Sequence, residues 1–332
     1  MAGDDLVIAT HGRSFWVMER VNVLRQLGAK ETAARLFAPA TALRGLDSGA
    51  AIDYFLPATP TSLKIEIHDA DGRLVRSLDG VKPDAKPKSE GGDDDEDDGP
   101  KGPPPPTMKP GLNRFSWDMR HPGFVDFPNM ILWTSRNRGG PLALPGRYRV
   151  TLTVDGRQQS QMLDIGVDPR VTDATPDALR ERFALAMQVR DRVSQANEAV
   201  LLIRGITDQA RARAATASDP GLKASLDGLI AGLRAVEGRI YQVRNESRQD
   251  PLNFPIMLND KLAGLLGVIE SAEARPTDQT RQAFAELSGQ LDRELAAMAA
   301  LLDTDLARIN TALGAAGLAP ITRTPQVPKP AA

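Results

Sequence analysis

The sequence of 332 residues contains no cysteine and only three histidines. The lack of cysteine excludes disulfides, thiolate nucleophiles and zinc–thiolate sites, although it leaves the compartment open, because cytosolic and exported proteins can both lack cysteine. His11, His68 and His121 lie in different segments and form no pair at metal-ligand spacing. We therefore predict no metal site and no cofactor, and we interpret the histidines as structural or solvent-facing.

The chain also lacks a surplus of positive charge and a long apolar run. Its formal net charge is −2, which predicts no nucleic-acid partner. No apolar run approaches the roughly 20 residues that span a bilayer, and the acidic start at Asp4 and Asp5 does not resemble a signal peptide. We therefore expect no membrane span, and a cytoplasmic location if the chain is expressed as given. The acidic run 93–98 lacks the ligand pattern of an EF-hand and is interpreted as a solvated linker.

Motifs of catalysis are missing as well. The sequence has no G-x-S-x-G elbow, no Walker A loop and no G-x-G-x-x-G turn. A glycoside hydrolase needs two carboxyl groups at a defined separation. Asp118 and Asp126 are the candidates for such a pair, but their spacing alone does not bring them together. A glycoside hydrolase that uses Asp118 or Asp126 is therefore the last of the functional alternatives.

The first part of the chain is rich in strand signals. In residues 1–45, apolar runs at 6–9 and 14–18 flank His11-Gly12-Arg13, which predicts a short β-hairpin or two successive strands. Such a hairpin is marginal alone, so its apolar surface needs a partner, and we predict self-association through residues 5–18 if none is present.

Residues 46–168 carry alternating apolar residues and the turns Asp71-Gly72 and Asp155-Gly156, which favour an antiparallel immunoglobulin- or fibronectin-like β-sandwich. Two stretches interrupt the alternation. Residues 81–110 are acidic, Pro-rich and almost free of apolar side chains, which predicts disorder. Residues 119–145 form a long irregular loop that contains Phe124, Phe127 and Trp133. These rings either pack the loop onto a neighbouring surface or stack on a sugar. The second reading makes the chain a carbohydrate-binding module with a glycan as its partner.

Residues 172–316 show helical periodicity throughout. The clearest seam repeats with 4-3 spacing and consists of Leu222, Leu226, Leu229, Leu233, Val236, Ile240 and Val243. Four such helices with short connections predict an antiparallel four-helix bundle. Arg190, Asn197 and Arg204 share one face of its first helix and are interpreted as a solvated face, with a polar pocket between helices as the alternative. Residues 317–332 are expected to be a flexible tail.

Several segments resemble a known family. Residues 5–18, DLVIATHGRSFWVM, are similar to the phrase that closes the propeller of the bacterial BNR-repeat, sortilin-like "glycosyl hydrolase" family. Further segments resemble the exit strand, the sandwich domain and the helical tail of that family: 35–40, 110–120, 145–150, 190–194 and 258–262. The Asp-box of the family's propeller blades, S-x-D-x-G-x-T-W, does not occur in this sequence.

The resemblance implies an α+β multidomain architecture. Residues 1–45 would be the remnant of the last propeller blade and its exit strand, 46–168 the sandwich, 172–316 the bundle and 317–332 the tail. It implies a non-catalytic accessory or interaction region whose partner, through residues 5–18, is an upstream propeller or another protein. No catalytic residue carries over, because the family's propeller face is not in this sequence, and its hydrolase name rests on fold similarity. The resemblance further implies a periplasmic or extracellular parent protein.

Overall fold

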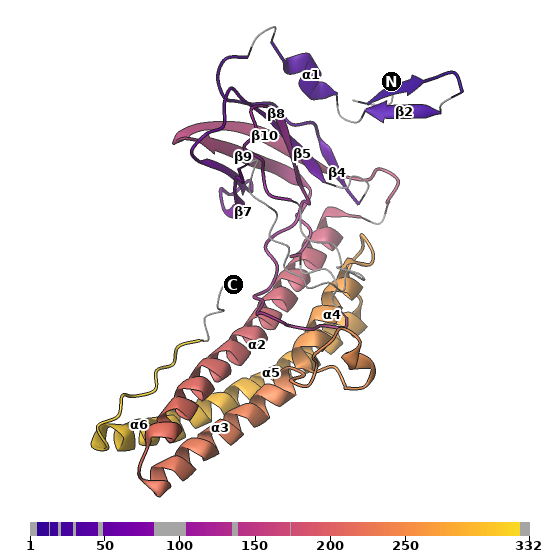
Figure 1. Cartoon of the computed structure of the whole chain (residues 1–332). Helices are drawn as coiled ribbons and strands as arrows, with labels where there is room; N and C mark the ends of the chain where they lie inside the picture. The colour runs from indigo at the N-terminus through magenta and orange to yellow at the C-terminus, as the bar shows by residue number, and fades with distance from the viewer. Residues whose placement is uncertain are drawn as a thin grey trace. The chain divides into compact units, whose positions relative to one another are not determined.

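The computed structural model describes residues 5–12, 14–18, 21–28, 31–45, 49–82, 104–134, 139–172 and 174–325. The chain is mixed α+β, with most strands in its first half and the long helices after them (Figure 1). It divides into two compact units, one of residues 1–122 and 139–180 and the other of residues 123–138 and 181–332. The α+β composition is as predicted. Residues 123–138, however, belong to the unit of the helices and not to the unit of the sheets, where the sequence placed them.

The N-terminal elements are a two-stranded antiparallel sheet and a short helix. Strands β1 (Leu6–Ala9) and β2 (Phe15–Met18) pair with each other, and α1 (Asn22–Gln26) follows. The predicted hairpin is therefore present. Gly12 and Ser14, in the connection, both have positive φ angles, which lets the chain reverse over a few residues.

A five-stranded sheet has the strand order β4-β10-β9-β6-β7. Its strands are β4 (Ala42–Arg44), β6 (Leu63–His68), β7 (Leu74–Asp79), β9 (Gly146–Val154) and β10 (Arg157–Val167). Asp155 and Gly156 join β9 to β10 with φ angles of 47° and 80°, the sign that a type I′ hairpin turn requires. The Asp-Gly turns thus connect antiparallel pairs as predicted. In contrast, β4 runs parallel to β10, where the sequence suggested antiparallel strands only.

A three-stranded sheet has the order β3-β5-β8, formed by β3 (Arg35–Leu36), β5 (Ala50–Leu56) and β8 (Gly111–Trp117). Its inward residues share one hydrophobic cluster with those of the five-stranded sheet. Trp117 and Tyr54 of the smaller sheet and Ile65 and Leu152 of the larger one are among its fully buried members. The alternation of apolar residues along these strands is what allows each sheet to bury one face.

The insert at 81–110 is structured at its ends. Val81 forms a parallel bridge with Thr107, and the Met108 N–H donates to the Val81 carbonyl at 3.0 Å. Met108 is 2% exposed and lies in the core of the sheets. The prediction of disorder is therefore wrong for residues 104–110, because one apolar side chain anchors them. The acidic run 93–98 lies outside the described residues.

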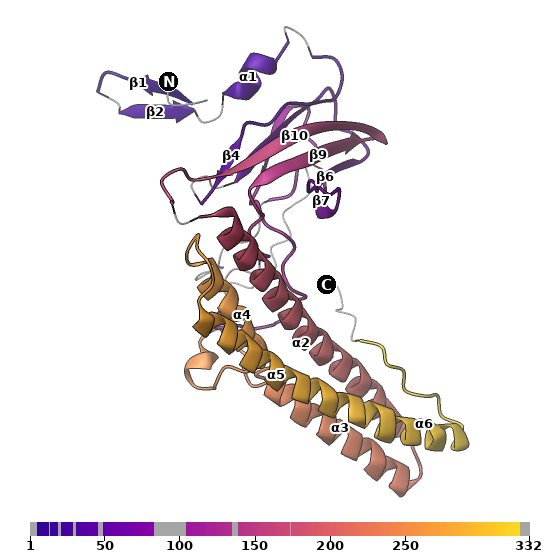
Figure 2. The same ribbon diagram turned by 180° about the vertical axis from the view of Figure 1, so that it is seen from behind.

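The second half of the chain consists mainly of helices, some antiparallel and some parallel to their neighbours (Figure 2). They are α2 (Pro176–Thr216), α3 (Pro220–Ile240), α4 (Leu258–Glu270) and α5 (Asp278–Ala300), the last of which continues through a π-helical turn (Leu301–Asp305) into α6 (Leu306–Ala315). Asp219 and Thr277 cap α3 and α5 through their side chains. Among the described residues, no helix combines the length and the apolar character that crossing a bilayer requires.

The apolar seams of the helices form one cluster. Residues Leu222 to Ile240 of the predicted 4-3 seam are buried, and they pack with the inward residues of α2 and of α5–α6. Val243 is the exception: α3 ends at Ile240, and Val243 is exposed.

The chain beyond α6 is not a free tail in its described part. Ile321 is buried, and the Asn310 side chain bonds both its N–H and its carbonyl. Gln209 holds the N–H and the carbonyl of Thr322 in the same way. The expectation of a flexible tail from residue 317 is corrected for these residues, because two amide side chains and one apolar side chain fix the backbone. Residues 326–332 lie outside the described residues.

Candidate functional site

The β1–β2 hairpin is the largest concentration of exposed apolar side chains among the described residues. Its register pairs Leu6 with Met18, Val7 with Val17, Ile8 with Trp16 and Ala9 with Phe15. Since paired residues share a face and faces alternate along a strand, one face carries Leu6, Ile8, Trp16 and Met18 and the other carries Val7, Ala9, Phe15 and Val17. Exposed fractions of the large apolar side chains run from 41% for Leu6 to 72% for Phe15.

Both faces of this hairpin are therefore apolar and uncovered. A strand with one wet face alternates apolar and polar residues, whereas a strand that is covered on both faces is a continuous apolar run. β1 and β2 are continuous apolar runs in sequence, but no described residue covers either face. Each strand also has one edge that pairs with no other described strand. The residue pattern of the hairpin is that of strands covered by neighbouring sheets on both faces.

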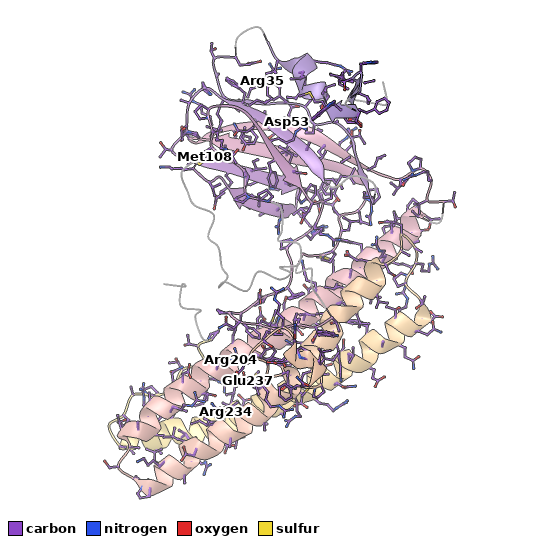
Figure 3. The ribbon with its side chains drawn as sticks, turned by 45° about the vertical axis from the view of Figure 1, so that its right-hand side comes forward. Arg35, Asp53, Met108, Arg204, Arg234 and Glu237 are labelled. Carbon is purple, nitrogen blue, oxygen red and sulfur yellow. The ribbon has the colours of Figure 1, made fainter. Side chains whose placement is uncertain are left out.

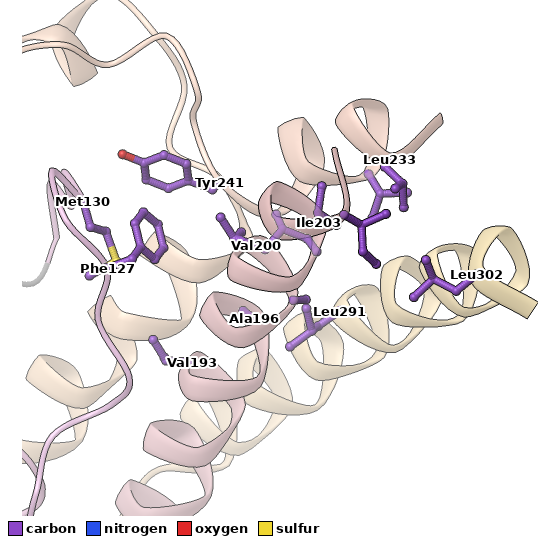
Figure 4. Packing of buried hydrophobic residues seen from close by; sticks show 14 of the residues in the cluster. Phe127, Met130, Val193, Ala196, Val200, Ile203, Leu233, Tyr241, Leu291 and Leu302 are labelled. Carbon is purple, nitrogen blue, oxygen red and sulfur yellow. The ribbon is translucent and has the colours of Figure 1, made fainter. Parts of the chain in front are cut away.

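The aromatic segment, residues 123–134, has the opposite environment. Phe124 and Phe127 are 6% and 3% exposed and belong to the core of the helices. Phe127 and Met130 pack near Val193 and Val200 of α2 and beside Tyr241 (Figure 4). Trp133 is 44% exposed. Of the three residues predicted to bind carbohydrate, only Trp133 has an accessible ring, so Phe124 and Phe127 serve packing.

Arg204 of α2 connects the aromatic segment to α3. Its guanidinium lies 4.8 Å from the ring centre of Phe127 and 5.5 Å from that of Tyr241. Its Nε donates to Glu237 of α3 at 2.7 Å, and the two residues are neighbours in the helical unit (Figure 3). Phe127 and Tyr241 meet edge to face with ring centres 5.0 Å apart. A charged pair and two rings thus join the aromatic segment to α2 and to the C-terminal end of α3.

A buried polar network fixes the backbone of the aromatic segment. Asn197 of α2 donates to the Val125 carbonyl at 2.7 Å and accepts from Asn259 of α4 at 3.1 Å. The carboxylate of Asp260, also on α4, accepts the backbone N–H groups of Trp133 and Thr134 at 2.8 and 3.0 Å. All three side chains are buried, so each bond satisfies a group that would otherwise be costly to desolvate.

The stripe of Arg190, Asn197 and Arg204 therefore does not face solvent as a whole. Asn197 is fully buried and Arg204 is largely covered. The interpretation as a solvated face is wrong for these two residues, because the aromatic segment covers that side of α2, and the Arg190 side chain is also only 18% exposed. Sequence reasoning missed Asn259, Asp260 and Tyr241 as the residues that bind the aromatic segment. Two adjacent polar residues at the start of an apolar helix were the one available signal.

The candidate catalytic carboxylates do not form a defined pair. Asp118 belongs to the unit of the sheets and Asp126 to the unit of the helices. Partial burial is the main cause that raises the pKa of Asp118, and a hydrogen bond from the Arg120 N–H and the charges of Arg76 and Arg120 oppose it. Asp126 is exposed and accepts the N–H of Phe127 at 2.7 Å.

The histidines also stay apart. His11 is exposed in the hairpin turn, His68 ends β6, and His121 lies in the irregular segment after β8. Within the described ranges, no group of three or more His, Asp or Glu side chains is placed to hold a metal ion. Among the described residues considered so far, the exposed apolar side chains of the hairpin are thus the candidate interaction site. Comparison with protein-family models and with curated proteins finds no match.

Proposed function

We propose that this chain is an accessory interaction region of a BNR-repeat, sortilin-like propeller protein, and that the β1–β2 hairpin completes a sheet of that propeller. In this proposal the two packed sheets are an immunoglobulin- or fibronectin-like sandwich and the helices an antiparallel four-helix bundle. The chain supplies contacts and no catalytic group of its own. The parent protein would be periplasmic or extracellular.

The observation that carries the proposal is the exposure of both apolar faces of the hairpin. A hairpin that docks on a single surface needs one apolar face only. Two apolar faces and two free edges fit a position between neighbouring sheets, with strand pairing at an edge, which is the environment of a propeller blade. The similarity of residues 5–18 to the closing phrase of that family points to the same occupant.

The interpretation of the sheets as an immunoglobulin-like sandwich has support of its own. The hydroxyl of Tyr148, in β9, donates to the carbonyl of Leu144 at 2.7 Å, four residues upstream. This is the bond of a tyrosine corner, which immunoglobulin-like domains use to fix a strand connection. The ring of Tyr148 also meets the buried Trp117 edge-on, with centres 5.6 Å apart.

The test is to co-express the chain with a BNR-repeat propeller whose last two strands have been deleted. We expect the two proteins to co-purify in equal amounts. Ile8→Lys places a charge on one face of the hairpin and Val17→Lys places one on the other, so each substitution alone should abolish co-purification if both faces are covered. Leu74→Lys and Met162→Lys are matched controls, because these residues are also exposed apolar residues on strands.

Each outcome is informative about the occupant. Loss of binding in only one of the two hairpin variants would mean docking on a single surface and would overturn the sheet-stacking proposal. Absence of binding by the wild-type chain would reject the propeller as the partner. Sedimentation of the chain alone separates the remaining case, because concentration-dependent self-association that Ile8→Lys removes would identify a second copy of this chain as the occupant.

A further inference from the structure

A hollow of about 260 Å³ lies on the helical unit, where α3, α4 and α5 come together. Its lining consists of Arg239, Met257, Leu258, Lys261, Gln290, Arg293 and Glu294. Its size is close to the lower end of the range for small-molecule sites, about 300 Å³. The hollow therefore has room for a small ligand and not for a peptide.

Positive charge dominates this lining. Three cationic side chains, one from each helix, face a single carboxylate. Arg239 donates to Glu294 at 2.7 Å, so that pair is internally neutral. Lys261 and Arg293 are exposed and form no ion pair with any of the residues that the structure describes. They leave the hollow with two uncompensated positive charges.

The acidic residues that directly precede these two cations in the sequence are engaged elsewhere, whereas Glu294, which follows Arg293, pairs with Arg239 in the hollow. Asp260 precedes Lys261, but its carboxylate binds the backbone of residues 133 and 134. Asp292 precedes Arg293, but it pairs with Arg192 of α2 at 2.6 Å. The excess of positive charge is therefore built into the packing of the helices and is not an accident of local composition.

The start of α4 lines one side of the hollow and adds little net positive charge. Leu258 is its first residue, and the partial positive charge of the helix N-terminus is offset by Asp260 in the first turn and by the Asn259 side chain, which accepts the Asp260 N–H at 2.8 Å. Met257 and Leu258 also give the hollow an apolar wall, next to the side-chain amide of Gln290.

We propose that this hollow binds a small phosphate-type dianion, either inorganic phosphate or the phosphate group of a small molecule. The Lys261 ammonium is a compact charge on a flexible side chain, and the planar Arg293 guanidinium has several N–H donors. Together they can bind the oxygens of a dianion. Gln290 donates one amide N–H to Glu286 at 3.3 Å, and its second N–H can donate to a further oxygen. This site is independent of the hairpin and of the propeller proposal.

The experiment is a titration of the ¹⁵N-labelled full chain with inorganic phosphate, followed by backbone amide shifts at constant ionic strength set with chloride. We expect saturable shifts that concentrate at the start of α4 and at residues 290–294. The double variant Lys261→Gln/Arg293→Gln should weaken binding at least tenfold. Glu294→Gln should tighten it severalfold, since it removes the one carboxylate and frees Arg239.

A control variant separates a site from general attraction. Lys223→Gln/Arg211→Gln removes the same charge from exposed positions outside the hollow, and it should titrate like the wild type. Equal binding by the Lys261→Gln/Arg293→Gln variant, equal losses in both double variants, or shifts scattered over the chain would overturn the proposal. Glycerol 3-phosphate then identifies the source: tighter binding than inorganic phosphate indicates an organic phosphate, and equal binding indicates the free ion.

Discussion

The β1–β2 hairpin and the aromatic segment carry similar side chains in opposite environments. Each is a short non-helical stretch with several large apolar residues. Phe127 of the aromatic segment is 3% exposed, whereas Phe15 of the hairpin is 72% exposed. The helices of the same chain cover the aromatic segment, and no described residue covers the hairpin.

The difference shows what covering requires besides apolar surface. The aromatic segment has its own backbone satisfied by Asn197, Asp260 and Tyr241, so it lies on the helices in one register. In the hairpin, β1 and β2 bond each other along their facing edges, but no described residue covers the apolar faces. Exposed apolar patches of this kind mark interaction surfaces in soluble proteins. Substitutions in the aromatic segment, in the residue that holds it and in the hairpin test this contrast.

Phe127→Ala should have the largest effect on stability. The side chain is buried against α2 and Tyr241, so its truncation should lower the free energy of unfolding by about 3–5 kcal/mol. Urea denaturation followed by ellipticity at the helical band measures this. Val243→Ala, at an exposed position after α3, is the control and should change little. An equally small effect of Phe127→Ala would mean that the aromatic segment is not part of the helical core.

Asp260→Ala should have an intermediate effect. It leaves the N–H groups of Trp133 and Thr134 without their acceptor, which should cost about 2–3 kcal/mol. Asp260→Asn keeps one acceptor oxygen and should fall between the alanine variant and the wild type. Amide hydrogen exchange at residues 133 and 134 should accelerate in the same order. Unchanged exchange at these two amides would contradict the role assigned to the carboxylate.

Trp16→Ser should have the smallest effect on the isolated chain. The side chain is 65% exposed, so the free energy of unfolding should change by no more than about 0.5 kcal/mol. The same denaturation experiment tests this. A loss as large as that of Phe127→Ala would show that the chain covers its own hairpin, and the comparison between the two segments would fail.

Much of the local structure follows from sequence patterns. Asp155-Gly156 forms the turn it predicts, because few other residues accept two successive positive φ angles. Asp219 and Thr277 cap the helices that follow them, and the seam from Leu222 to Ile240 is buried. These features depend on residues that are neighbours in the chain or one turn apart, so the sequence contains the information directly.

The errors concern segments without a repeating pattern. Neither residues 104–110 nor residues 318–324 have a repeating apolar pattern, yet Met108 and Ile321 each anchor a stretch of backbone. The aromatic segment has no periodicity that tells which surface its rings contact. In each case a few contacts with residues far away in the sequence decide the conformation, and such contacts leave no local signal.

Sequence patterns alone are enough to predict the order of strands and helices and the hairpin with its two apolar faces, because apolar periodicity and turn chemistry act over a few residues. The coverage of Phe124 and Phe127 by the helices, and the exposure of the hairpin, depend on the tertiary structure. It alone also brought Arg239, Lys261 and Arg293 around one hollow and turned Asp260 and Asp292 away from them. Burial and net charge at a site depend on which distant residues meet, and packing sets those meetings.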